Sequence, residues 1–164
     1  MFPLFVNMNI SVEQSVEALL SRNFSEEGLT DLFLIETNWN PQSRKLVVYI
    51  DSDDGLTLAK CQEISRLLQN ELHAYLKDPF QLDVSSPGLD RPLISSRQYK
   101  KNIGRKVRVD LRNGITKSGV LRFVHGDRIG LEIKERIKGR KSSQTELQEI
   151  GLQEISKTFV EISF

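Results

Sequence analysis

The side chains that could perform acid–base, nucleophilic or metal chemistry are few and scattered in this sequence. The chain has two histidines, His73 and His125, and one cysteine, Cys61. A nucleophile needs a base and an orienting group, and neither histidine lies in a recognisable motif. One cysteine and two distant histidines give no spacing typical of metal ligands. We therefore expect no catalytic residue, no bound metal and no cofactor.

A short acidic segment superficially resembles a calcium-binding loop. Asp51, Asp53 and Asp54 precede Gly55, but Gln62 occupies the position where such a loop needs a glutamate. We interpret the segment as a turn that places negative charge near a helix N-terminus.

Two other reactive residue types have simple structural explanations. Ser85 and Ser86 lack the strand-to-helix setting of a serine nucleophile, so we expect them to lie in a turn. Cys61 falls on the apolar face of a predicted helix, which favours a buried small side chain over a reactive thiol.

Positive charge is concentrated in the second half of the chain. Residues 1–93 hold 7 basic and 14 acidic residues, a net −7, whereas residues 94–164 hold 16 and 8, a net +8. The total of +1 conceals this division, which indicates that the second half binds a polyanion. Lysine and arginine clusters suit phosphate oxygens. The candidate RNA-binding residues are Arg97, Lys100, Lys101, Arg105, Lys106, Arg108, Arg112, Lys117, Arg122 and Arg128.

A second basic cluster lies in a polar stretch, 134–145, which we expect to be a long flexible hairpin loop. It could clamp RNA or be a variable insertion, and both interpretations stay open. Its cations are Lys134, Arg136, Lys138, Arg140 and Lys141.

Apolar periodicity predicts an α+β fold for the first half. Helices are expected over 11–22, which begins with a capping box, and from the N-cap Thr57 to Leu72. Strands are expected at 32–35 and 46–50, paired as a hairpin, and at 80–84. The order helix-strand-strand-helix-strand describes a sheet covered by helices.

The second half alternates over shorter segments. Strands are expected at 107–111, 120–124, 129–133 and 159–162, separated by turn residues. Short strands at this spacing favour a small closed barrel of the SH3-like or OB-like kind.

A turn-rich segment, SSPGLDRPL at 85–93, separates the two halves. We therefore expect an N-terminal domain at 1–84, a stiff connector at 85–93 and a C-terminal domain at 94–164. Pro87-Gly88 is typical of a type II turn, and Asp90 and Arg91 could pair with either domain.

The segment LDVSSPGLDRPL at 82–93 resembles the signature of the bacterial ribosome maturation factor RimP family. VYID at 48–51, GLTL at 55–58, IGRKV at 103–107 and SGVL at 118–121 resemble further parts of the family pattern. The resemblance implies an N-terminal α/β domain and a C-terminal SH3-like barrel. Its signature residues are Asp83, Ser85, Ser86, Pro87, Gly88, Leu89, Asp90, Arg91 and Pro92.

The function follows from the resemblance alone. The family implies a non-catalytic assembly factor that binds the free small ribosomal subunit and assists its maturation, through ribosomal RNA and a small-subunit ribosomal protein. A single cysteine and the lack of a long apolar run favour a cytoplasmic protein without a membrane partner, and we expect a monomer. The segment 134–145 is longer than in the family pattern, and residues 1–10 have no counterpart there.

Two alternatives stay open. The basic barrel could act as a stand-alone RNA-binding regulator, although base stacking needs exposed aromatic residues that this half scarcely supplies. An enzyme with dispersed carboxylates is the third interpretation, and no clustered acid and base support it.

Overall fold

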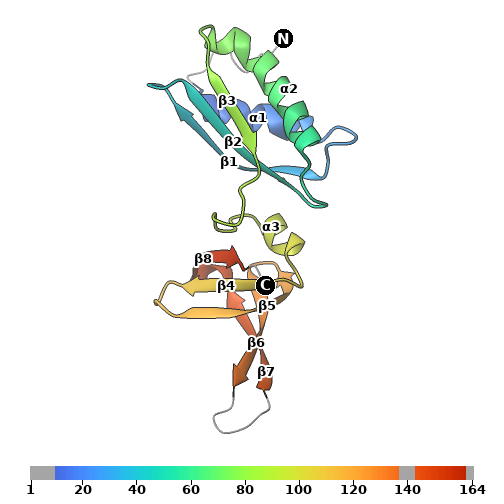
Figure 1. Cartoon of the computed structure of the whole chain (residues 1–164), viewed down its shortest axis with the longest axis vertical. Coiled ribbons are helices and arrows are strands. Elements are labelled where there is room, and N and C mark those ends of the chain that lie inside the picture. Colours follow the sequence, from blue (N-terminus) through green and yellow to red (C-terminus); the bar gives the residue numbers. More distant parts are fainter. Residues whose placement is uncertain (1–9, 137–142, 162–164) are drawn as a thin grey trace. The chain divides into compact units, whose positions relative to one another are not determined.

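The chain forms two compact units, unit 1 (Met1–Pro87) and unit 2 (Gly88–Phe164) (Figure 1). The computed structural model describes residues 10–136 and 143–161. The division between the units falls inside the predicted connector. Gly88 has a φ of +70°, the positive value predicted for the glycine of the Pro87-Gly88 turn.

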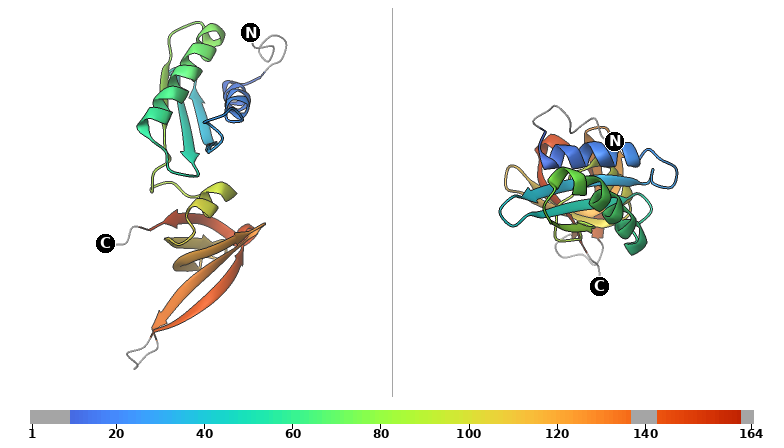
Figure 2. Two further views of the ribbon diagram at one scale, coloured as in Figure 1. Left: turned by 90° about the vertical axis from the view of Figure 1, so that its right-hand side faces the viewer. Right: turned by 90° about the horizontal axis from the view of Figure 1, so that it is seen from above.

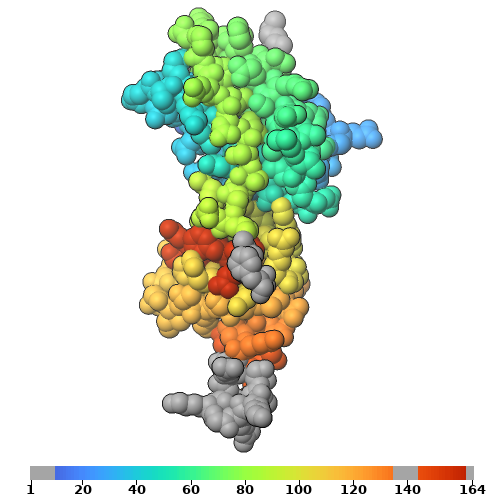
Figure 3. Space-filling view, in the orientation of Figure 1, coloured from blue at the N-terminus to red at the C-terminus, as the bar shows by residue number. Residues whose placement is uncertain are grey.

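Unit 1 is a three-stranded sheet with two helices. In chain order its elements are α1 (Val12–Asn23), β1 (Leu32–Asn40), β2 (Lys45–Ser52), α2 (Leu58–Leu76) and β3 (Gln81–Ser85). The strand order is β1-β2-β3; β1 and β2 pair as the predicted antiparallel hairpin, and β3 runs parallel to β2. The predicted order of elements is confirmed. In Figure 3, the green α2 and β3 form much of the visible face of this unit.

Both helices of unit 1 begin at the predicted caps. The Gln14 backbone N–H donates to Ser11 Oγ at 3.2 Å, and the Ser11 N–H donates to Gln14 Oε1 at 3.1 Å. At the start of α2, the Lys60 N–H donates to Thr57 Oγ1 at 3.2 Å. Each cap satisfies donors that the first helical turn leaves without a partner.

The core of unit 1 lies against one face of its sheet. Alternate residues Leu46, Val48 and Ile50 of β2 have no exposed surface, whereas Val47 and Tyr49 between them are partly exposed. Burial of each such aliphatic side chain stabilises the unit by about 1.5–3 kcal/mol. Because both helices contribute to this one cluster, both cover the same face of the sheet. Their buried members include Val16, Leu19, Leu20, Ile64, Leu68 and Leu72.

Unit 2 is a five-stranded antiparallel sheet preceded by one short helix. Its elements are α3 (Ser96–Lys101), β4 (Lys106–Leu111), β5 (Thr116–His125), β6 (Arg128–Arg136), β7 (Ser143–Gly151), the 3₁₀ helix η2 (Leu152–Glu154) and β8 (Ile155–Val160). The strand order is β7-β6-β5-β4-β8. The fully buried core side chains are Val107, Val109, Leu121, Ile129 and Leu131.

The closed barrel expected from the sequence is not confirmed. Over the described residues, β7 and β8 are the two edges of the sheet and do not pair with each other. Pairing of β6 with β7 ends at Arg128↔Gly151, and η2 then leads into β8. The outer edge of β8 is partly covered by the chain itself, since the Leu93 N–H donates to the Thr158 carbonyl at 2.8 Å.

The described part of the polar stretch expected as a loop is strand. β6 continues to Arg136 and β7 begins at Ser143, so the two form a ribbon that extends beyond the neighbouring strands (Figure 2). Most described side chains of β7 are exposed, and Ile150 is the buried apolar one. An edge strand with a solvated face is held mainly by backbone pairing. Its polar sequence shows no apolar alternation, so the strand was not predicted. Lys138, Arg140 and Lys141 lie outside the described residues.

The two ends of unit 2 also differ from the prediction. The short helix α3 has no counterpart among the predicted elements, and the last strand lies at Ile155–Val160 rather than at 159–162.

Candidate nucleic-acid interface

The first group of predicted cations lies on α3. This helix begins with a capping box in which Gln98 Oε1 accepts from the Ser95 N–H at 3.1 Å. Tyr99 is buried, and its hydroxyl donates to Thr158 Oγ1 of β8 at 2.8 Å. Burial raises the pKa of the Tyr99 phenol, and its bond to Thr158 partly opposes this rise. The helix is thus anchored on the sheet. Its cations are Arg97 and Lys101, which are half-buried, and Lys100, which is exposed.

A second group lies on the outer face of the sheet, opposite the core. Along β4, Val107 and Val109 are buried, whereas Lys106 and Arg108 are exposed. The side chains on this outer face are distributed over adjacent strands of one antiparallel sheet, so cations far apart in the sequence become neighbours.

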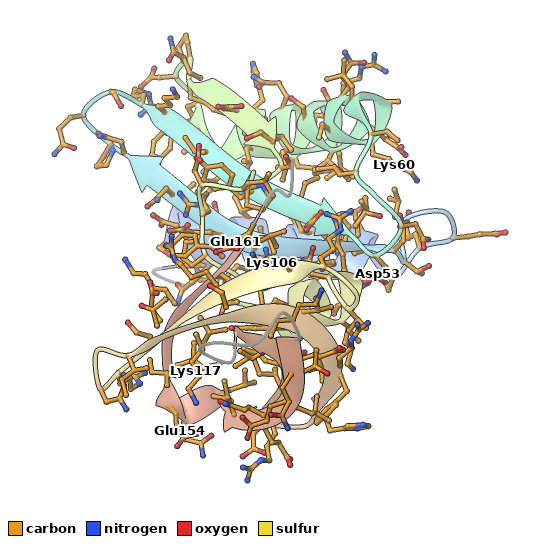
Figure 4. All side chains as sticks on the ribbon, turned by 60° about the horizontal axis from the view of Figure 1, so that its bottom comes forward. Asp53, Lys60, Lys106, Lys117, Glu154 and Glu161 are labelled. Carbon is orange, nitrogen blue, oxygen red and sulfur yellow. The ribbon has the colours of Figure 1, made fainter. Side chains whose placement is uncertain are left out.

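Four of the predicted cations contact carboxylates on this face. Lys106 Nζ lies 3.5 Å from Glu161 Oε2 (Figure 4), Arg108 Nε 3.5 Å from Asp110 Oδ1, and Arg128 Nε 3.0 Å from Glu149 Oε1. Arg122 pairs with Glu132 on β6. All four cations are about half exposed, and such surface pairs contribute about 0–1 kcal/mol each. A phosphate oxygen can therefore replace the carboxylate at small cost.

Two further cations act within the fold. Arg112 Nε donates to the Gln153 carbonyl at 2.9 Å and its backbone N–H to the Glu154 carbonyl at 2.9 Å, which ties the end of β4 to η2. Lys117 Nζ donates to Gln148 Oε1 of β7. Figure 4 labels Lys117 and Glu154, which together line a depression at this end of unit 2. We assign both cations a structural role.

Other cations carry no such contact. Arg105, which precedes β4, and Lys100 on α3 are exposed and have no side-chain partner among the described residues. Lys134 on β6 and Lys157 on β8 are also exposed and have no side-chain partner among the described residues. Of these two, Lys157 was not among the residues predicted from the sequence. The composition of this half was the only signal for Lys157.

A shallow groove of about 570 Å³ brings three of the cations together. Lys106, Arg122 and Lys134 come from β4, β5 and β6, and Ser118 and Val120 lie between them. Gly119 and Glu132 complete its wall. A groove with several cations, one hydroxyl and an apolar residue suits a sugar–phosphate backbone.

The structure also reveals aromatic residues that the sequence reasoning overlooked. Phe123 on β5 and Phe159 on β8 are partly exposed and do not belong to the described core of unit 2. The guanidinium carbon of Arg108 lies 4.8 Å from the centre of the Phe159 ring, a cation–π contact. A bulge between Leu121 and Phe123 reverses the alternation of inward- and outward-facing side chains along β5. A regular strand pattern therefore did not place Phe123 on the outer face.

Unit 1 contains no assembled metal site among its described residues. No three His, Cys, Asp or Glu side chains in the described parts of the chain lie close enough to hold an ion. The first turn of α2 contains no acidic residue, so the predicted charge bias at its N-terminus comes only from residues before the cap. Cys61 is partly exposed rather than buried, and desolvation raises the pKa of its thiol. None of the described helices is both long and apolar enough to cross a membrane.

The predicted signature residues lie at the end of β3 and in the segment that follows it. Asp83 and Ser85 lie on β3, and the residues that follow it are mostly exposed, including Gly88, Leu89 and Asp90. They mark the passage from one unit to the next.

Comparison with known proteins gives the relationship of the chain. Residues 20–90 match the family model described as the RimP N-terminal domain. The chain is 38% identical over 99 residues to a protein of Cytophaga hutchinsonii named ribosome maturation factor RimP, a match that covers 57% of this chain and 59% of that protein. A protein of the same name from Flavobacterium psychrophilum is 39% identical over 100 residues, which cover 61% of this chain and 62% of the relative. Over this part of its length the chain is similar to proteins of the RimP family.

The match spans about three fifths of the length of these RimP relatives. The RimP family model covers α2, the whole sheet of unit 1 and the first part of the signature, and it ends at residue 90. The predicted RNA-binding cations begin at Arg97, beyond that model. The geometry and charge of unit 2 therefore indicate its candidate nucleic-acid interface, and the family model does not.

Proposed function

We propose that the chain is a ribosome maturation factor that binds the free small ribosomal subunit and assists its maturation without making or breaking a covalent bond. The names of the relatives support the ribosomal role, and the charge division supports a binding role. We propose that it acts as a monomer in the cytoplasm, with unit 2 as a member of the SH3-like class, and without a cofactor.

The observation that carries the proposal is the outer face of unit 2. Its groove collects Lys106, Arg122 and Lys134, and Lys100 and Arg105 add exposed cations on α3 and before β4. Ribosomal RNA presents a dense array of phosphates to such a surface, and release of counterions favours the association.

Unit 1 supplies the opposite charge. The Asp53 N–H donates to the Asp31 carbonyl at 2.9 Å and Ser52 Oγ donates to Asp31 Oδ2 at 2.6 Å, which ties the loop before β1 to the loop before α2. Glu26 and Asp54 are exposed on these two loops. Small-subunit ribosomal proteins are the basic partners that we propose for this acidic unit.

A charge-reversal experiment tests the RNA contact. The double variant Lys100→Glu, Arg105→Glu should bind free small subunits about 10- to 100-fold more weakly at physiological salt and should reduce the dependence of log K on log[salt] by about two. The control variant Lys45→Glu, Arg66→Glu makes the same charge change on exposed positions of unit 1 and should retain the salt dependence. Equal losses in both variants would contradict a specific role for unit 2.

A stand-alone RNA-binding regulator is the second candidate. The partly exposed rings of Phe123 and Phe159 favour it, because stacking on single-stranded RNA needs such residues. It predicts equal binding to messenger RNA and to small subunits, whereas the maturation role predicts a preference for the subunit.

A further inference from the structure

The outer face of β5 and β6 carries an aromatic ring whose position requires a glycine on the neighbouring strand. The register of these strands shifts between Leu121 and Phe123, so that Phe123 lies opposite Gly130. A Cβ atom on Gly130 would lie only 2.2–2.6 Å from three carbon atoms of the Phe123 ring. The ring therefore packs directly on the backbone of β6, and any larger residue at position 130 would displace it.

This ring is not part of the hydrophobic core. The buried neighbours along the two strands, Leu121, Ile129 and Leu131, face the opposite side of the sheet. Phe123 keeps part of its surface exposed, and exposed His125 lies beside it with ring centroids 5.2 Å apart and planes inclined by 43°. Two adjacent rings on a solvated sheet face offer a stacking surface outside the hydrophobic core.

Two arginines flank the two rings. Arg128, opposite His125 across the strands, and Arg122, next to Phe123, each pair with a half-buried or exposed carboxylate on the same face. Arg122 also lines the groove that contains Lys106 and Lys134. The stacking surface and the groove thus meet at Arg122.

We propose that Phe123 and His125 bind an unpaired RNA base by stacking, while the groove beside them holds the adjacent phosphates. This inference rests on the proposed function, because it names the RNA feature that unit 2 would recognise. Bases inside an A-form helix do not expose their faces, so the site selects a single-stranded loop or bulge. An acidic protein segment could match the cations, but aspartate and glutamate side chains have no aromatic face to stack on the two rings.

The test compares two RNA probes and three variants of the full chain. The probes are a fluorescein-labelled, unstructured 12-nucleotide RNA of mixed sequence and the blunt duplex formed with its complement, measured by anisotropy. Phe123→Leu keeps an apolar side chain but has no aromatic face, Phe123→Tyr keeps the face, and Gly130→Ala displaces the ring. Circular dichroism and thermal unfolding verify that each variant is folded.

The expected result separates stacking from charge. Phe123→Leu and Gly130→Ala should bind the single strand about tenfold more weakly, the effect of one lost stacking contact, while duplex binding changes less than twofold. Phe123→Tyr should bind like the wild type. If Phe123→Leu binds the single strand as the wild type does, stacking is refuted although RNA binding by unit 2 stands.

Two other outcomes are distinct. Failure of the wild type to bind either RNA would refute both this inference and the RNA contact in the proposed function. Displacement of the single strand by a poly-glutamate peptide at the same charge concentration, with no effect of Phe123→Leu, would assign the face to an acidic protein and would also refute the stacking site.

Discussion

Replacing Arg44 with alanine tests how the sheet of unit 1 is joined to the end of α2. Arg44 lies in the turn between β1 and β2, and its guanidinium donates to three carbonyl oxygens. Nη2 donates to Leu76 at 3.1 Å and to Asp78 at 3.2 Å, and Nε donates to Pro79 at 3.0 Å. The guanidinium carbon also lies 5.5 Å from the centre of the Trp39 ring. One side chain thus satisfies carbonyl groups at and after the helix end.

The loss expected for Arg44→Ala is about 2 kcal/mol. A hydrogen bond contributes about 1 kcal/mol net, but two of the three are exposed and water can replace them. The cation also interacts favourably with the helix C-terminus and the Trp39 ring, each by about 0.5 kcal/mol. Arg44→Gly loses the same contacts but should cost only about 1 kcal/mol, since Arg44 has a φ of +52° that an L-residue adopts at a cost of about 1 kcal/mol.

Urea unfolding followed by Trp39 fluorescence measures these losses. Trp39 is the only tryptophan and lies on β1, so its signal reports on unit 1. With a urea m-value of about 1–2 kcal/mol/M, Arg44→Ala should lower the midpoint by about 1 M or more. Lys45→Ala, at the next and exposed position, should change it little. An Arg44→Ala midpoint within 0.2 M (about 0.3 kcal/mol) of the wild type would show that the Arg44 contacts do not stabilise unit 1.

Three further substitutions or reactions have defined outcomes. Tyr99→Phe should destabilise unit 2 by about 1–2 kcal/mol, because Thr158 Oγ1 loses its buried hydrogen-bond donor. Adding Thr158→Val to this variant should restore part of the lost stability. Amide hydrogen exchange in β4 and β8 measures both effects. Gly119→Ala should cost about 2–3 kcal/mol in thermal unfolding, since a Cβ there would lie 2.5 Å from the Glu132 carbonyl oxygen, and a change below 0.5 kcal/mol would contradict the close approach. Because desolvation raises the pKa of the Cys61 thiol, less thiolate is present at pH 7.5 and the residue should react with DTNB more slowly than glutathione; a faster reaction would contradict this.

Elements with a local signal were predictable from the sequence. The caps Ser11 and Thr57 and the alternation of Leu46, Val48 and Ile50 act through neighbours in the chain, so their types and spacing suffice to indicate a helix or a strand. Gly119 lies within the SGVL segment of the family resemblance. The structure shows why a glycine is needed at this position, because the backbone of β6 lies too close for a Cβ atom.

Features that depend on register were not predictable. The polar β7 is held by backbone pairing with β6, and its sequence has no apolar alternation that would predict a strand. The partners of Arg44 lie 32–35 residues away in the sequence. The bulge that brings Phe123 opposite Gly130 also changes which residues of β5 face the solvent, so the aromatic part of the candidate interface required the paired strands.

The proposed function requires that the basic unit binds the free small ribosomal subunit through phosphate contacts. Co-sedimentation of the purified full chain with free small subunits, free large subunits and assembled ribosomes, repeated from low to high salt, tests it most directly. We expect binding to the free small subunit in preference to the other two particles, with log K falling linearly as log[salt] rises. Equal binding to all three particles, or binding to none, would contradict it.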